Sequence, residues 1–325
     1  MTVQVSVVVP TYKRPYLLDR CLAALTAQEF PADRFEIIVV DDAGGDTATW
    51  RVVQRRRLST RGRARIRYLR VRERHGPAAA RNGGWRVAAA PVIAFTDDDC
   101  VPDRNWLREG LLALGDRRAA VWGRIVMPLP QEPTDYERDA ARLASAGFVT
   151  ANCFCRTRVL SAVGGLDENF TVAWREDSDL YFSLLERGLD VAQAPRATVV
   201  HPIRPASWGA SLRQQRKVLF DALLYKKHPR LYRARIRPSP RWDYYAILTL
   251  LLVALGSALA DMPLPTFAAA AGWLAATARL CCARLRFTSH RPAHVAEMAL
   301  TSALIPPLAV FWRFVGAVKY RVLFF

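Results

Sequence analysis

Histidine and cysteine are both scarce in this sequence. The 325 residues include five histidines and six cysteines, and no two cysteines have the spacing of a CxxC motif. No cluster of histidines accompanies them. The spacing therefore argues against a zinc finger and against a disulfide framework, and it is consistent with a reducing compartment.

Acidic residues are in the minority. There are 29 of them against 47 lysines and arginines, which gives a net charge of +18. Such a charge favours nucleic acid, a membrane surface or an anionic substrate as a partner, with a general arginine bias as the alternative explanation. The most basic stretch, residues 55–74, has Tyr68 as its one aromatic residue and contains no nucleic-acid-binding module. We therefore expect no nucleic-acid partner. Two interpretations of the stretch remain: a surface that faces anionic lipid, or a solvated face.

Charge is absent from three long apolar stretches near the C-terminus, residues 244–260, 262–278 and 298–312. Each comes near the ~17 residues that a helix needs to cross a bilayer. Aromatic residues that suit a membrane interface flank them: Trp242, Tyr244, Tyr245, Trp273, Trp312 and Tyr320. We predict a helical membrane region over residues 241–325, after a catalytic domain over residues 1–240. A buried helical bundle is the alternative.

The distribution of basic residues predicts an orientation in the membrane. Residues 226–241 and 279–291 are both basic, whereas the loop 261–265 carries one Asp and no basic residue. The positive-inside rule then places both basic flanks, and with them the catalytic domain, in the cytoplasm. The third stretch is interrupted by Pro306 and Pro307. Three alternatives remain for it: a membrane span, a re-entrant segment or an interfacial helix on the membrane surface. The N-terminus has no basic n-region or cleavage site, so we expect no signal peptide.

Strand-like and helix-like patterns alternate over the first 240 residues. Strands are expected at residues 3–10, 35–42, 66–71 and 91–96, with helical patterns between them. This alternation predicts an α/β fold with a doubly wound, mainly parallel sheet flanked by helices. Ligands of such sheets collect at the carboxyl ends of the strands. Residues 10–12, 41–42 and 97–99 should therefore share one rim.

Two acidic motifs carry the candidate chemistry. Asp97, Asp98 and Asp99 follow an apolar strand, and such rigidly held oxygen ligands suit Mg²⁺ or Mn²⁺. A metal held there would neutralise a departing diphosphate, whereas the alternative is a solvated acidic turn or a helix cap. Glu176 and Asp177 open an amphipathic helix. They either complement the helix dipole, or one of them acts as a general base beside Trp174, on whose face a sugar could stack.

Five segments give this sequence a recognisable signature: PTYKRP, VVDD, AAARNGG, FTDDDCVPD and GGLDENF…WREDSDL. In this order and spacing, over roughly residues 4–230, they resemble the inverting glycosyltransferases of family 2, which have the GT-A fold. The resemblance implies a nucleotide-diphosphate sugar as donor and a divalent metal as cofactor. It also implies inversion at the anomeric carbon by direct displacement.

The resemblance implies roles for the residues at the donor site. The nucleoside pocket would be lined by Pro10, Thr11 and Tyr12. Asp41 or Asp42 would bind the base or the ribose, and the alternative for this pair is a strand-end turn. Arg81 would lie near the diphosphate, with a solvated helix position as its alternative. The neighbouring Asn82 is expected to pack or to cap.

The resemblance also assigns the metal and the catalytic base. Asp97 and Asp98 would meet the ribose and the metal, and Asp99 would bind the metal. His201 would be a metal or diphosphate ligand, or a structural histidine. Asp177 matches the second acid of the family's Glu-Asp motif and is the candidate base, with Glu176 as the second candidate.

One family signature is missing. Processive members carry QxxRW after the acidic helix, but residues 213–218 read RQQRKV and have no Trp at the required place. We therefore expect a single transfer to each acceptor, with a glycan or a lipid-linked, cell-envelope molecule as the acceptor. The RQQRK segment could attract a diphosphate or an anionic head group, or form a solvated helix face. Two alternative functions fit the sequence less well. The lack of glycine in PTYKRP argues against a nucleotidyltransferase, and the intact acids argue against a non-catalytic scaffold that binds nucleotide sugars.

Overall fold

The computed structural model describes residues 3–60, 64–71, 73 and 75–324, and its contacts divide the chain into two compact units. The first unit contains the residues up to Pro128 together with Arg142–Pro202. The second contains Leu129–Ala141 and the residues from Ile203 onward. The predicted boundary at residue 240, between a catalytic and a membrane region, lies inside the second unit and stays a prediction.

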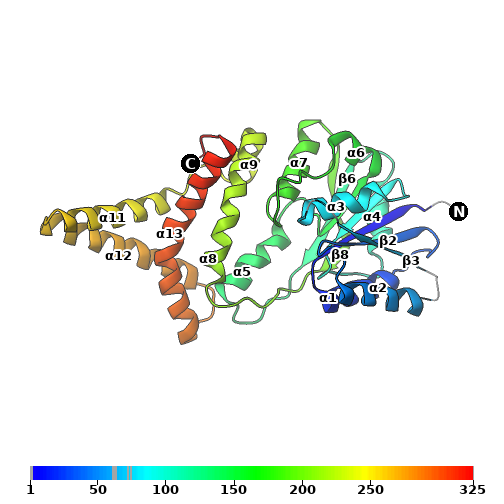
Figure 1. The fold of residues 1–325 in the computed structure, drawn as a ribbon, viewed down its shortest axis with the longest axis horizontal. Coiled ribbons are helices and arrows are strands. Elements are labelled where there is room, and N and C mark those ends of the chain that lie inside the picture. The colour runs from blue at the N-terminus through cyan, green and yellow to red at the C-terminus, as the bar shows by residue number, and fades with distance from the viewer. Residues whose placement is uncertain (1–2, 61–63, 72, 74, 325) are drawn as a thin grey trace. The chain divides into compact units, whose positions relative to one another are not determined.

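A mixed sheet forms the centre of the first unit (Figure 1). Among the described residues it has eight strands in the order β3-β2-β1-β4-β7-β6-β8-β5. The β1–β2, β1–β4, β2–β3 and β6–β8 pairs are parallel, and the β4–β7, β6–β7 and β5–β8 pairs are antiparallel. The strands are β1 (Val5–Thr11), β2 (Phe35–Asp41), β3 (Arg65–Arg70), β4 (Val92–Thr96), β5 (Val101–Pro102), β6 (Ala120–Val126), β7 (Asn152–Arg156) and β8 (Val191–Val200). The prediction of a mainly parallel α/β sheet is confirmed, and its antiparallel pairs all involve β5 or β7.

Helices cover both faces of this sheet because its central strands are apolar on both sides. Every residue of β1 and β2 is buried, as expected for central strands of a parallel sheet. One core cluster includes apolar residues of α1 (Pro15–Thr26), α2 (Thr47–Ser59) and α4 (Trp106–Leu114). The other includes residues of α3 (Pro77–Arg86), α6 (Thr157–Val163) and α7 (Glu176–Glu186). A 3₁₀ helix, η1 (Arg142–Ser145), also belongs to this unit.

Helix α3 lies very close to the sheet. A Cβ atom added to Gly84 would lie 2.4 Å from a methyl carbon of Val8 in β1. Glycine at this position therefore permits the approach, which buries the middle of α3. Arg81 and Asn82, predicted from sequence as site residues, are consequently held against the sheet.

The second unit is helical. Its helices are α5 (Asp135–Ala141), α8 (Ala210–Gln214), η2 (Gln215–Val218), α9 (Leu219–Lys227), α10 (Pro229–Arg235), α11 (Trp242–Leu259), α12 (Pro263–Leu285) and α13 (Pro292–Tyr320). Helices α11 and α12 form a hairpin, in which the hydroxyls of Ser257 and Thr266 are hydrogen-bonded at 2.9 Å. Figure 1 shows this hairpin projecting to one side of α13.

Helices α11, α12 and α13 are each long and apolar enough to cross a membrane, judged by length and composition. In the most apolar window of α11 and of α12, 11% of the residues are buried inside the protein. These two helices therefore do not form the buried bundle considered as an alternative. In α13 the buried share rises to 33%.

Helix α13 is continuous, and it has one buried face and one exposed apolar face. The expected interruption at Pro306 and Pro307 is wrong, because the helix runs through both prolines. A proline inside a helix costs roughly 3 kcal/mol, and here the packing of one long face outweighs that cost. A Cβ atom on Gly316 would lie 2.7 Å from the carbonyl oxygen of Leu219, so α13 and α9 are in close contact. Side chains exposed along α13 include Leu300, Leu304, Phe311, Phe314 and Val318.

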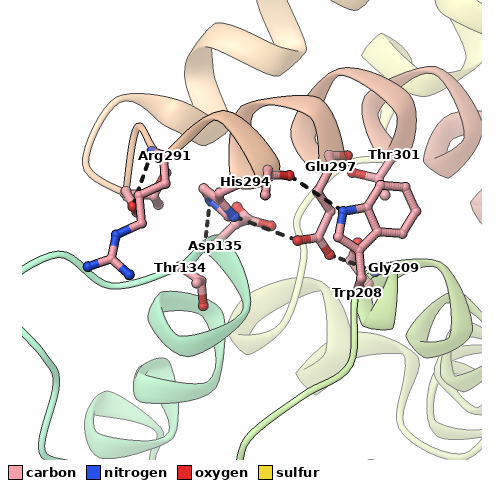
Figure 2. A network of polar contacts seen from close by, with 12 residues as sticks. Thr134, Asp135, Trp208, Gly209, Arg291, His294, Glu297 and Thr301 are labelled. Atoms are coloured by element: carbon pink, nitrogen blue, oxygen red, sulfur yellow. Dashed lines mark hydrogen bonds and ion pairs between the residues drawn. The ribbon is translucent and has the colours of Figure 1, made fainter.

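A polar network joins α5 to the beginning of α13 and to the chain before α8 (Figure 2). The backbone N–H of Asp135 donates to Nε2 of His294 at 3.3 Å. Oε1 of Glu297 accepts a hydrogen bond of 2.7 Å from the backbone N–H of Gly209. The guanidinium of Arg284, at the end of α12, donates to both Asp135 and Thr301 at 2.7 Å. These bonds explain why α5 belongs to the second unit although it lies in sequence between two parts of the first.

Candidate active site

The carboxyl ends of three adjacent strands meet at one rim. Strand β1 ends at Thr11 and pairs in parallel with β2, so that Thr11 is opposite Asp41. On its other side β1 pairs in parallel with β4, which leads directly into the acidic triplet. The structure thus brings the three predicted segments 10–12, 41–42 and 97–99 to the same edge. Pro10 and Thr11 are buried there, whereas the side chain of Tyr12 is half exposed.

Asp98 links two segments of this rim through its hydrogen bond and ion pair. Its side chain is fully buried, its Oδ2 accepts a hydrogen bond of 2.7 Å from the Thr11 hydroxyl, and Nη1 of Arg14 lies 3.2 Å from its Oδ1. Burial raises the pKa of Asp98 to about 7, against the opposing effects of Arg14 and the Thr11 hydroxyl. Arg14 also lies 3.4 Å from Asp99. Sequence reasoning did not single out Arg14, although it lies in the PTYKRP segment.

Asp99 and His201 belong, with Cys100, to a group of described residues that could hold a metal ion. Nε2 of His201, which directly follows β8, lies 3.5 Å from Oδ1 of Asp99. One potential ligand atom from each of Asp99, Cys100 and His201 lies within 4.8 Å of the others. Carboxylate oxygen and imidazole nitrogen are both suitable ligands for a divalent ion such as Mn²⁺. This group, found among the described residues, does not include Asp97.

Arg81 joins two of the acidic segments. Its Nη2 lies 2.6 Å from Asp97, and its Nη1 lies 3.3 Å from Glu176. Its side chain is buried, so the alternative of a solvated helix residue is wrong. Burial alone would lower the pKa of Arg81, but the carboxylates of Asp97, Asp177 and Glu176 raise it above its ordinary value. The Nε atom of Arg81 is buried and has no hydrogen-bond partner among the described residues.

The two acids that open α7 have different surroundings. Glu176 is buried, and burial together with the adjacent Asp177 raises its pKa to about 8, although Arg81 opposes this rise. Asp177 is less buried, and its Oδ1 accepts a hydrogen bond of 2.6 Å from the hydroxyl of Thr150. Burial raises the pKa of Asp177, while Arg81 and Thr150 oppose that rise. Nothing in the sequence indicates Thr150, because the pairing joins segments that are distant along the chain.

The two acids after β2 also differ. Asp41 is fully buried, and its carboxylate accepts hydrogen bonds from the backbone N–H groups of Ala43 and Asp46 and from the Tyr68 hydroxyl. Asp42 accepts a hydrogen bond of 2.9 Å from the backbone N–H of Gly76 and remains partly exposed. Asp41 therefore orders the β2–α2 loop, and Asp42 is the more accessible acid.

Other predicted features are structural. Asn82 packs as expected, because its side-chain amide donates to the carbonyl of Leu166 and accepts from the indole N–H of Trp85. In the basic stretch 55–74, Arg56 pairs with Asp19 at 2.6 Å, and Arg67 pairs with the buried Glu36 at 3.2 Å. Part of this stretch therefore holds α2 and β3 to the rest of the unit. Residues 61–63, 72 and 74 of the stretch lie outside the described residues.

Two glycosyltransferase families match this chain. Residues 6–161 match glycosyl transferase family 2, and residues 92–315, more than half of the chain, match glycosyl transferase family group 2. The chain belongs to glycosyltransferase family 2. This family 2 enzyme is a glycosyltransferase, and the resemblance inferred from its motifs is confirmed.

Two curated relatives show how far the similarity extends. The glycosyltransferase AglE of Haloferax volcanii is 28% identical over 226 residues, which cover 66% of this chain and 71% of AglE. The validoxylamine A glucosyltransferase of Streptomyces hygroscopicus subsp. jinggangensis is 41% identical over 109 residues, which are 33% of this chain but only 25% of that protein. Similarity to the second relative therefore concerns one part of the chain.

Solved structures confirm the fold. The mannosyltransferase PcManGT of Pyrobaculum calidifontis, solved with GDP-Man and Mn²⁺, has a TM-score of 0.57 at 22% identity, over 99% of this chain and 88% of that one. TarS of S. aureus, solved with UDP, has a TM-score of 0.51 at 16% identity, over 94% of this chain and 90% of that one. The predicted GT-A-type fold is confirmed by these likenesses.

Proposed function

We propose that this enzyme transfers one sugar, with inversion, from a nucleotide-diphosphate sugar to an acceptor hydroxyl, in a metal-dependent reaction. The observation that carries the proposal is that the two acids of α7 differ in their contacts and in their exposure. Arg81 pairs with Glu176, whereas Asp177 accepts hydrogen bonds from Thr150 and stays partly exposed. Asp177 is thus the acid available to accept the proton of an attacking hydroxyl, as a general base must.

The donor would bind along the rim. Pro10, Thr11 and Tyr12 would line the nucleoside pocket, and the accessible Asp42, rather than the internally bonded Asp41, would contact the base or the ribose. The buried Nε of Arg81 is a charged donor without a partner in the described structure. A diphosphate oxygen would satisfy it, because guanidinium groups bind phosphate oxygens strongly.

A divalent ion would be held by Asp99 and His201, whose ligand atoms the structure brings together. Bound there, it would neutralise charge on the departing nucleoside diphosphate. The Mn²⁺ and GDP-Man reported with PcManGT, and the UDP reported with TarS, support a donor and a metal of this kind. Asp97, also predicted as a ligand, lies against Arg81, and its role in this proposal is to orient that guanidinium.

We further propose that the α11–α12 hairpin spans the membrane and that the catalytic domain faces the cytoplasm. The basic segments at residues 226–241 and 279–291 support this orientation. The larger buried share of α13 supports its placement as an interfacial helix that exposes one apolar face to lipid. A membrane position makes a lipid-linked or other cell-envelope acceptor the fitting substrate.

The proposal is tested by Asp177→Asn in the full-length enzyme, assayed with a panel of nucleotide sugars and with product analysis. We expect transfer to fall by at least a hundredfold, while donor binding with Mn²⁺ stays within about threefold of the wild type. Glu186→Gln, at the exposed end of the same helix, is the matched control and should retain activity. Full transfer by Asp177→Asn would refute the base assignment. With the wild-type enzyme, an activated sugar as product would instead indicate a nucleotidyltransferase, and the absence of any product would indicate a binding scaffold.

A further inference from the structure

An aromatic cluster in the second unit joins α9, α10 and the end of the chain. The ring centroids of Tyr225 and Tyr232 are 5.5 Å apart, and those of Tyr225 and Phe324 are 5.2 Å apart. The rings of Tyr232 and Phe324 complete the triangle at 5.4 Å. The three rings provide π faces on which cationic groups can lie.

Two arginines occupy this cluster. The guanidinium of Arg313, from α13, lies 4.6 Å from the ring centroid of Phe324, and that of Arg233 lies 4.8 Å from the ring centroid of Tyr225. In each, the Nη1 atom is buried and has no hydrogen-bond partner among the described residues. Arg313 is the more enclosed, with 6% of its surface exposed. A buried charged donor atom without an acceptor is costly, because its desolvation penalty is not offset by a hydrogen bond.

The charges around this cluster do not balance. Burial lowers the pKa of Arg237, and the nearby charges of Arg241 and Arg313 lower it further, with Tyr232 and Asp221 opposing. Arg241 is already neutralised by Asp243, through contacts of 2.6 and 2.8 Å. Asp221 is buried near Tyr232, whose hydroxyl donates to it at 3.4 Å. Because Arg241 is paired with Asp243, Asp221 is the one carboxylate that opposes Arg313 among the described groups that shift the pKa of Arg237, and positive charge is in excess among these groups.

The position of the cluster indicates what kind of anion would balance it. Arg241 directly precedes α11, the first helix that is long and apolar enough to cross a membrane. On α13, Arg313 lies between Phe311 and Phe314, whose side chains are largely exposed. Cationic groups beside exposed apolar residues are typical of the level at which lipid head groups lie.

We propose that Arg233, Arg237 and Arg313 form a binding site for the phosphate group of an anionic membrane lipid. The planar guanidinium groups would donate paired hydrogen bonds to the phosphate oxygens, and the lipid chains would continue along the exposed apolar helices. The site lies wholly in the second unit and does not depend on the identity of the sugar, on the metal or on Asp177. Its failure would leave the proposed transfer reaction untouched.

The test is a titration of the full-length protein in neutral detergent with short-chain phosphatidylglycerol, followed by thermophoresis. A phosphate-free diacylglycerol and inorganic phosphate serve as separate arms. We expect phosphatidylglycerol to bind saturably, and Arg313→Gln to weaken that binding about tenfold. Arg230→Gln, which removes a charge from an exposed position nearby, should leave the affinity within twofold. Arg313→Lys, which keeps the charge but not the planar fork, should recover part of the lost affinity.

Because Arg313 is buried, a second variant guards against a folding defect. Arg237→Gln changes a partly exposed residue of the same site and should weaken lipid binding several-fold without loss of helical content. Wild-type affinity for phosphatidylglycerol in either folded variant would overturn the proposal. Equal binding of the phosphate-free diacylglycerol would also overturn it. Binding of inorganic phosphate as tight as that of the lipid would replace the lipid with a soluble phosphate and overturn the lipid assignment.

Discussion

Thr150 donates a hydrogen bond of 2.6 Å from its hydroxyl to Oδ1 of Asp177. Thr150 is fully buried just before β7, and Asp177 lies in the first turn of α7, so the bond fixes the carboxylate relative to the sheet. A hydroxyl that donates to a carboxylate stabilises its charged form. The bond therefore both orients the proposed base and keeps its pKa lower than burial alone would set it.

Thr150→Val should impair the base without removing it. Loss of the hydroxyl raises the pKa of Asp177 further, and a base works only when deprotonated, so the acidic limb of the kcat/KM profile should move to higher pH. A hydrogen bond to a charged group contributes about 1.5–3 kcal/mol, so kcat at neutral pH should fall by ~10-fold or more. Thr150→Ser should restore both quantities. An unshifted pH profile in Thr150→Val would contradict the positioning role.

Arg81→Met should strongly destabilise the first unit. The substitution leaves the acids at positions 97 and 176 without their shared cation, and breaking one partner of a buried pair costs about 3–5 kcal/mol. Arg86→Met, on the same helix, removes an exposed pair with Glu168 and should cost less than ~1 kcal/mol. Thermal unfolding of both variants checks the contrast. Equal melting temperatures would show that the Arg81 bridge adds nothing to stability.

Stability should decline as pH rises from about 5 to 8. The raised pKa of Glu176, about 8 against an ordinary value of 4.5, means that the folded state holds a proton that the unfolded state releases in this range. The folded state then binds more protons, so its stability is greatest at low pH and is lost as Glu176 ionises. Glu176→Gln should flatten this decline by on the order of 2 kcal/mol, leaving the contributions of Asp98 and Asp177, whose pKa values are also raised. Melting temperatures across pH in metal-free buffer test this, and an equally steep decline in the variant would refute it.

His201→Ala should weaken metal binding selectively. Mn²⁺ added with a nucleoside diphosphate should stabilise the wild type, because a ligand that binds only the folded state raises its melting temperature. Losing one ligand of the Asp99–His201 group should lower metal affinity by roughly 10–100-fold, by analogy with the loss of groups that support metal ligands. His290→Ala, at an exposed position, is the control and should respond to Mn²⁺ like the wild type. An undiminished Mn²⁺ response in His201→Ala would remove this residue from the metal site.

The proposed membrane topology predicts which positions can be labelled from each side. In a cysteine-free background, Asp261→Cys in the loop between α11 and α12 should react with an impermeant maleimide added outside intact cells. Arg286→Cys, just after α12, should react only once the cells are opened. Both positions are exposed, so burial does not limit the reaction. The reverse pattern would invert the proposed orientation, and reaction of both from outside would exclude a spanning hairpin.

Much of the fold could be predicted from the sequence because its signals are local. The runs of β-branched residues in β1 and β2, the two acidic turns and the three uncharged stretches are each readable from neighbouring residues. The parallel pairing of β1 with β2 and β4 then follows from general rules of α/β folds, which is why the sequence predicts the shared rim. The interruption expected at Pro306–Pro307 is wrong because proline propensity is local, whereas the packing that keeps α13 helical through both prolines comes from other helices.

The sequence by itself determined the family, the alternation of strands and helices, and the identity of the acids. Only the tertiary structure decided how those acids differ. Arg81 is buried between Asp97 and Glu176. Thr150 donates a hydrogen bond to Asp177. The carboxylate of Asp41 accepts internal hydrogen bonds, while Asp42 stays accessible. Each distinction depends on a partner many residues away and on the exclusion of water around it. The partner and the exclusion of water cannot be predicted from spacing along the chain, because they arise only when the helices and strands pack.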